Sequence, residues 1–134
     1  MKPEIQAKFA TYPAEAQKQL EAVRCFILTI AKECNLAAVA ETLKWGEASY
    51  QVKGGTAIRM DWKPTDPDVI KIYVYCQTRL IRTFREIYRD EFEYEGNRAI
   101  VVPLHADIKQ GPLGHCLQMA LKYHSLKHQP LLGA

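Results

Sequence analysis

Residues 41–50 read ETLKWGEASY, and this stretch decides the predicted fold because the apolar pattern changes its period here. Before the stretch, apolar residues recur every three or four positions, which indicates amphipathic helices. After it, apolar and polar residues alternate, which indicates strands. We therefore expect the stretch to lead from the end of a short helix over residues 36–43, through a Trp-Gly turn, into the first strand of a sheet.

The N-terminal third of the chain predicts one long helix over residues 14–34. Residues 1–12 hold few apolar side chains, and we expect a loose arm or short helical turn there, docked by Phe9 and Tyr12. The long helix is amphipathic because its apolar residues fall at spacings of three and four, on one face. These residues are Leu20, Val23, Ile27, Ile30 and Cys34.

The middle of the chain predicts three strands between residues 49 and 75. Gly54-Gly55 indicates a two-residue hairpin turn, and the loop over residues 63–68 contains two prolines that break regular structure. One face of the strands is apolar and the other is polar and aromatic, which is typical of an antiparallel sheet covered by helices on one side. The apolar face comprises Val52, Ile58, Met60, Ile70, Ile72 and Val74.

The remaining residues predict a helix over 79–89, a second hairpin over 92–102, a last helix after Gly111-Pro112, and a frayed end over 129–134. We therefore predict a single α+β domain over residues 1–134 in two layers. An antiparallel five-stranded sheet would carry the helices mainly on one face. Ile27, Leu117 and Leu121 of the helices should share one core with the strands.

Composition points to an ordinary globular domain. The formal charge of +3 permits anionic partners, but no nucleic-acid motif is present, and we expect no nucleic-acid partner. No apolar segment approaches the roughly 20 residues that span a bilayer, and residues 1–19 lack the apolar run of a signal peptide. We expect a cytoplasmic protein without a membrane partner, with Cys25, Cys34, Cys76 and Cys116 as buried, reduced thiols.

Several motifs resemble the YdhG-like family of small bacterial domains, most of unknown function. They include Tyr12-Pro13 before the long helix, Glu41 with Lys44-Trp45-Gly46 and Tyr50 at the change of period, and Tyr123-His124 near the end. The resemblance implies a frataxin-like fold, and because one member is regarded as an iron chaperone, it implies iron as a candidate ligand. Frataxins carry an acidic ridge along their first helix. The long helix of this chain instead carries three acidic and three basic residues: Glu15, Glu21, Glu33, Lys18, Arg24 and Lys32.

The predicted ligand site lies at the Trp45 end of the sheet. Glu41 lies about one helical turn before Trp45, and the strand that follows brings Tyr50 close. Arg59 would hold an anionic group, Trp45 would stack on the ligand, and Glu41 would orient a donor, with Tyr73 on the polar face nearby. The alternative is structural, with Trp45 packed against the end of the sheet and Glu41 paired locally.

Three other clusters are weaker candidates. The polar sheet face could form the floor of a site for an anionic or aromatic ligand. The helix over 79–89 carries a stripe of four arginines that the acidic residues 90–95 can neutralise. His124 and His128 have the i,i+4 spacing of a metal chelate but lie near the expected frayed end. The polar face comprises Gln51, Arg59, Asp61, Lys71, Tyr73 and Tyr75.

No catalytic signature accompanies these clusters, and three classes of function stay open. The first is a binding domain for a small ligand or a metal ion. The second is a protein-interaction or iron-donor module with a protein partner. The third is an enzyme that acts on a small anionic substrate, which would need an acid or base with a strongly shifted pKa in a deep pocket.

Overall fold

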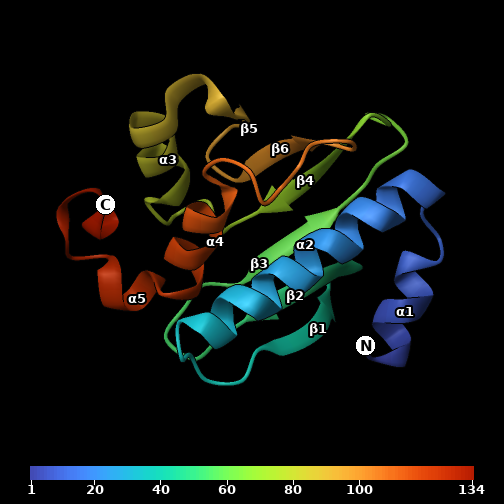
Figure 1. Cartoon of the computed structure of the whole chain (residues 1–134), viewed down its shortest axis with the longest axis horizontal. Coiled ribbons are helices and arrows are strands. Elements are labelled where there is room, and N and C mark those ends of the chain that lie inside the picture. Colours follow the sequence, from blue (N-terminus) through green and yellow to red (C-terminus); the bar gives the residue numbers. More distant parts are fainter.

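The computed structural model describes residues 1–134 and has an α+β architecture built on one antiparallel sheet (Figure 1). The six strands lie in the order β1-β2-β3-β4-β6-β5. They are β1 (Ala40–Lys44), β2 (Glu47–Gln51), β3 (Ile58–Asp61), β4 (Val69–Tyr73), β5 (Glu93–Glu95) and β6 (Ala99–Pro103). The helices are α1 (Pro3–Phe9), α2 (Ala14–Glu33), α3 (Leu80–Tyr88), α4 (Leu113–Leu121) and α5 (Tyr123–Leu126), with 3-10 turns η1 (Arg89–Glu91) and η2 (Pro130–Gly133).

The long helices cover one face of the sheet. In Figure 1, α2 lies across the strands, and it packs against both α4 and β4, while α4 also contacts β3. The side chains of Met60 and Ile72 face these helices and are buried, whereas their neighbours Arg59 and Lys71 point to the other side. The predicted α+β class is confirmed, and all nine of the predicted core residues belong to a single buried cluster.

The segment around residue 40 is a strand rather than a helix. β1 pairs with β2 along its whole length, and Trp45 and Gly46 form the two-residue turn between them. Both turn residues have positive φ, 55° and 75°, as a type I′ hairpin requires. The prediction of a helix over 36–43 is therefore wrong, because eight residues make a marginal helix and cross-strand pairing with β2 outweighs it. The added strand also corrects the predicted count from five to six.

The two glycines after β2 do not form a two-residue turn. Residues 52–57 are a longer connection that docks on the end of α4, where the Thr56 amide donates to the Ala120 carbonyl at 3.1 Å. Gly55 lies against the backbone of Leu121, and a Cβ atom built on it would be 2.1 Å from the Leu121 carbonyl oxygen. The glycine is therefore needed for close backbone approach rather than for a tight hairpin.

Both ends of the chain are docked on the domain. The N-terminal residues form α1, and Phe9 and Tyr12 are buried, as expected from the sequence. At the C-terminus, Leu132 is also buried, and the guanidinium of Arg79 donates to the main-chain carbonyl of Lys127. The expected fraying of residues 129–134 is wrong for this segment, because the buried Leu132 side chain holds it and the Arg79 guanidinium also donates to the Gln129 carbonyl at 3.4 Å.

The four cysteines are free thiols, but they do not share one environment. Cys116 is buried in α4, Cys34 is half-buried, and Cys25 and Cys76 are exposed. The expectation that all four are buried is wrong, because Cys25 lies on the solvent side of α2 and Cys76 follows the end of β4. No helix has both the length and the apolar character needed to cross a bilayer.

Shortening a central side chain tests the core. Ile72 lies in β4, pairs with Met60 on one side and Ile100 on the other, and is 1% exposed. We expect Ile72→Ala to lower the free energy of unfolding by about 2–5 kcal/mol through the cavity it leaves. Leu43→Ala is the control, since Leu43 lies at the exposed edge in β1. Urea unfolding measures both, and similar small losses would contradict this packing.

The β1–β2 turn predicts an unusual stabilising substitution. Trp45 is 90% exposed and holds a left-handed conformation that asparagine adopts more readily. Trp45→Asn should therefore raise the free energy of unfolding by a few tenths to about 1 kcal/mol. Thermal unfolding in parallel with Lys53→Asn, at another exposed loop position, measures the effect. A destabilised Trp45→Asn protein would show that the indole makes a stabilising contact.

Candidate functional site

The structure distributes the five predicted site residues over both faces of the sheet. Glu41 and Tyr50 are cross-strand partners in β1 and β2, and both are buried on the helix-covered face. Arg59 and Tyr73 are partners in β3 and β4 on the opposite, open face. Trp45 projects from the hairpin tip into solvent. The five residues therefore form two separate pairs and one isolated tryptophan, not a single cleft.

Glu41 forms an ion pair that joins the edge of the sheet to α2. The Nε of Arg24 lies 2.5 Å from Glu41 Oε2, and its Nη2 donates to Oε1 at 3.2 Å. Burial is the largest influence and by itself raises the pKa of Glu41. The hydrogen bonds and positive charge of Arg24, together with the nearby Tyr50 hydroxyl and Lys2 backbone, outweigh burial and leave the pKa below its ordinary value. The Tyr50 hydroxyl is sealed beside this pair without a well-formed hydrogen bond, and burial raises its pKa strongly. The Arg24–Glu41 pair therefore has a structural role, because it holds β1 against α2.

Arg59 and Tyr73 belong to a network of charges on the open face. Arg59 donates to Glu47 at 2.9 Å, and its guanidinium lies 5.8 Å from the centre of the Tyr73 ring. Lys71 donates to Glu95 at 2.9 Å in the next row. This part of the predicted polar face exists as expected, as a surface and not as a closed pocket.

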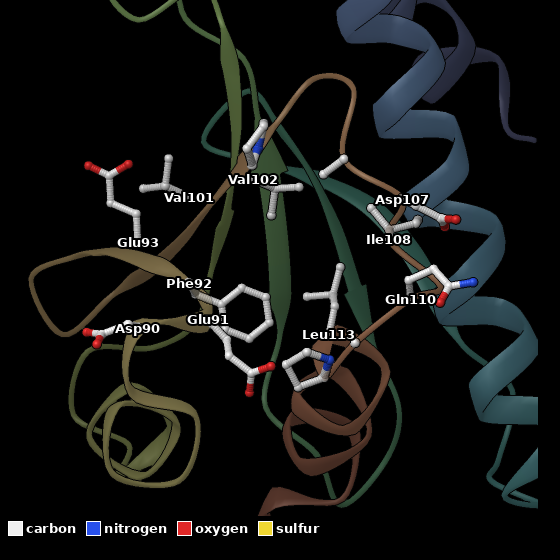
Figure 2. Close-up of a pocket in the computed structure, with 14 residues that line it drawn as sticks. Asp90, Glu91, Phe92, Glu93, Val101, Val102, Asp107, Ile108, Gln110 and Leu113 are labelled. Carbon is white, nitrogen blue, oxygen red and sulfur yellow. The ribbon is translucent and has the colours of Figure 1, made fainter.

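A large cavity lies elsewhere, at the β5–β6 end of the molecule. It has a volume of about 710 Å³ and is open to solvent on one side. It is lined by β6, the η1 turn with the start of β5, loop residues between 106 and 112, and the first residue of α4. In Figure 2, Phe92, Val102, Ile108 and Leu113 point toward a common space from these different segments. A volume of this size is in the range of small-molecule sites, which is roughly 300–1,000 Å³.

Local sequence explains why the cavity forms. Pro103 ends β6, so the chain leaves the sheet, and Gly111, with a φ of 85°, turns it back before Pro112 starts α4. On the other side, Arg89 adopts a left-handed φ of 42° that ends α3 and directs the η1 turn along the sheet. The loop and the η1 turn therefore form two opposing walls.

The rim of the cavity is acidic. Four carboxylates line it, and no lysine, arginine or histidine does. In Figure 2, Glu91 inclines toward the space, whereas Asp90 and Glu93 point outward. These three carboxylates have no ion-pair or hydrogen-bond partner in the protein, and Asp107 accepts only from the amide of Lys109. The cavity mouth therefore has a negative potential over an apolar floor.

An aromatic cluster supports the wall behind Phe92. The Phe92 ring meets Tyr88 and Tyr94 edge to face, at centroid distances of 6.4 and 6.1 Å, and the Tyr88 hydroxyl is hydrogen-bonded to Nδ1 of His115. Burial raises the pKa of Tyr94 to about 12, and burial also raises the pKa of the Cys116 thiol. Tyr94 and Cys116 are therefore neutral at pH 7 and add no charge to this wall.

The sequence interpretation missed this cavity because it assigned the acidic residues 90–95 to the arginine stripe of α3. The structure contains no ion pair between these two groups. Arg85 instead donates to the Gly96 carbonyl and covers the Tyr94 ring, and Arg82 is exposed. One feature of the sequence could have indicated the cavity: the apolar residue Phe92 lies between acidic neighbours. This pattern favours an apolar side chain inside a cavity with charged side chains at its rim.

The side chains that favour metal ions do not converge. The structure contains no group of three histidine, cysteine, aspartate or glutamate side chains arranged to hold a metal ion. His124 and His128, whose spacing made them a weak candidate for a chelating pair, are both exposed near the C-terminus. The residues therefore do not fit an iron site.

The Arg24–Glu41 pair predicts a specific pH dependence of stability. The folded-state pKa of Glu41 is lowered, so on acidification the unfolded state takes up a proton first. The contribution of the pair to the free energy of unfolding is therefore complete above the ordinary carboxyl pKa of about 4.3. It is lost as the pH falls through the lower folded-state pKa. Glu41→Gln should cost about 1.5–3 kcal/mol at pH 7 and flatten the acid limb. Urea unfolding between pH 3 and 7 measures this, with exposed Glu33→Gln as control. An unchanged acid limb would contradict the assignment.

Comparison with known proteins finds no match to this chain among protein-family models, curated proteins or solved structures. The resemblance to YdhG-like domains therefore stays a prediction from sequence motifs.

Proposed function

We propose that this chain is a small-ligand-binding domain whose cavity takes an organic cation with an apolar body. The observation that carries this proposal is the pairing of an apolar floor with a rim that holds only negative charge. The floor would remove the apolar body of the ligand from water, at roughly 25 cal/mol for each Å² buried. The rim would attract and orient the positive group.

Two side chains would select such a ligand. Glu91 inclines toward the cavity in Figure 2 and has no partner in the protein, so it is free to accept a hydrogen bond from an ammonium group. Phe92 presents its ring to the same space, where the ring can pack against the apolar body of the ligand and its face can hold a cation. An anionic ligand would be repelled by four carboxylates.

Binding is favoured over acid–base catalysis by the direction of the shifted pKa values. The strongest shifts belong to three tyrosines and Cys116, and all are upward because of burial. Such shifts keep these groups protonated and reduce the reactivity of the thiol. A general base that works near neutral pH would need a pKa near 7.

Fewer observations support the other interpretations of the sequence. The YdhG-like and frataxin-like assignment, a bacterial origin, a cytoplasmic location and an iron-chaperone role follow from motif resemblance and expectation alone. A protein-interaction role has one observation in its favour, the exposed indole of Trp45 at the hairpin tip. The cavity offers both shape and charge, and we therefore place ligand binding first.

A set of matched probes tests the proposed function. Phenethylamine, 2-phenylethanol and 3-phenylpropanoate share an aromatic body and carry a positive, neutral and negative group. We expect phenethylamine to raise the melting temperature most and 3-phenylpropanoate least, because ligand binding to the native state stabilises it by mass action. Nuclear magnetic resonance shifts should map to Phe92, Ile108 and Leu113.

Two variants make the test specific. Glu91→Gln should weaken phenethylamine binding about tenfold, which corresponds to roughly 1.4 kcal/mol, and Glu33→Gln on the surface of α2 should not. Ala106→Leu should abolish binding of every probe by filling the cavity that Ala106 lines. Tighter binding of the anionic probe, or shifts that map away from the cavity, would refute the proposal.

A further inference from the structure

The open face of the sheet carries a cluster of positive charge around Tyr73, on the side away from the helices. Three cationic groups lie over or beside the Tyr73 ring: Arg98 at 5.7 Å from its centre, and Arg59 and Lys63 at 5.8 Å. Together these side chains shield the ring, so Tyr73 is only 3% exposed although no helix covers it. We call Arg59, Lys63, Tyr73 and Arg98 the Tyr73 cluster.

The three cations come from three different segments. Arg59 is in β3 directly opposite Tyr73 of β4, and Tyr73 pairs in turn with Ala99 of β6. Lys63 lies in the loop between β3 and β4, and Arg98 lies in the turn between β5 and β6. Sheet register therefore fixes the centre of the cluster, while two loops bring further charge to it.

Carboxylates near the cluster leave much of its hydrogen-bonding capacity unused. Arg59 uses one amino group on Glu47, at 2.9 Å. Arg98 is 3.8 Å from Glu95, whose other oxygen is already bound to Lys71. Lys71 also lies 3.7 Å from Asp66. Lys63 has no ion-pair partner.

Two further polar groups lie in this region, the carboxylate of Asp61 and the hydroxyl of Tyr73. Asp61 accepts from the hydroxyl of Tyr12 at 2.5 Å, which occupies one of its oxygens. The Tyr73 hydroxyl has no hydrogen-bond partner in the protein, and unlike those of Tyr50 and Tyr94 it is not sealed from solvent. Burial raises the pKa of Tyr73, so the hydroxyl stays protonated at neutral pH and can donate.

We propose that the Tyr73 cluster is a second binding site, specific for a phosphate group. Two guanidinium groups and one ammonium group lie within 5.8 Å of the centre of one tyrosine ring, and the hydroxyl of that ring is a fourth donor. A tetrahedral phosphate has oxygens to accept from several of them, and arginine binds phosphate in a planar, two-point manner. A bound dianion would also relieve the mutual repulsion of the three cations. This site lies on the opposite face from the acidic cavity and does not depend on its function.

Titration with inorganic phosphate tests the proposal on the full chain. Ionic strength is held constant with sodium chloride, and the spectra follow the amides of Lys63 and Arg98 and the side-chain Nε–H signals of Arg59 and Arg98. We expect saturable shifts at these positions with phosphate, and weaker ones with acetate, which offers two oxygens. Glycerol 3-phosphate should bind as well if a phosphomonoester is accepted, and its failure to bind would restrict the site to free phosphate.

Matched variants separate binding from general charge attraction. Arg98→Gln, Lys63→Gln and Tyr73→Phe should each weaken phosphate binding by about tenfold or more. Arg82→Gln and Lys53→Gln remove exposed cations elsewhere and should leave it unchanged, as should Glu91→Gln at the cavity. Equal effects of phosphate and chloride, tighter binding of acetate, or full affinity in the cluster variants would overturn the proposal. Unchanged spectra in the absence of phosphate would show that the variants fold.

Discussion

Burial of one face of β3 and β4 beneath α2 and α4 is the constraint on which the rest of the structure depends. Side chains alternate along a strand, so placing Met60 and Ile72 against the helices places Arg59 and Tyr73 on the other side without further choice. A shift of the register by one residue would turn Arg59 and Tyr73 toward the helices and expose the core. The packing of the core thus also sets the position of the open-face charges.

The edges of the sheet are organised by different means. At the β1 edge, the Arg24–Glu41 pair joins the strand to α2, and a hydrogen-bonded charge pair of low exposure resists separation. At the β5 edge, β6 ends at Pro103, and the next regular element of the chain is α4. The sheet layer and the helix layer therefore diverge here. The cavity occupies this divergence, and its floor is the part of the apolar face that α4 leaves uncovered.

Charge is divided between the two faces of the molecule. The cavity is lined by four carboxylates and by no basic side chain, whereas the Tyr73 cluster on the other face holds three cations around one ring. A net formal charge of +3 for the whole chain hides this separation. Two sites of opposite charge preference on opposite faces would let one small domain contact a cation and an anion at once.

The sequence by itself determined the α+β class, the long helix α2, the strands β3 and β4, and their shared core, because each has a regular apolar period that only one structure can bury. It did not determine β1, the number of strands or the docking of the C-terminus. The short apolar run at residues 36–43 is compatible with a helix or a strand, and only pairing with β2 decided between them.

The candidate sites depended even more on tertiary structure. Glu41 and Arg24 lie 17 residues apart, and the cavity unites η1, β6 and α4. Such contacts arise from chain reversal between elements, and local periodicity carries no information about them.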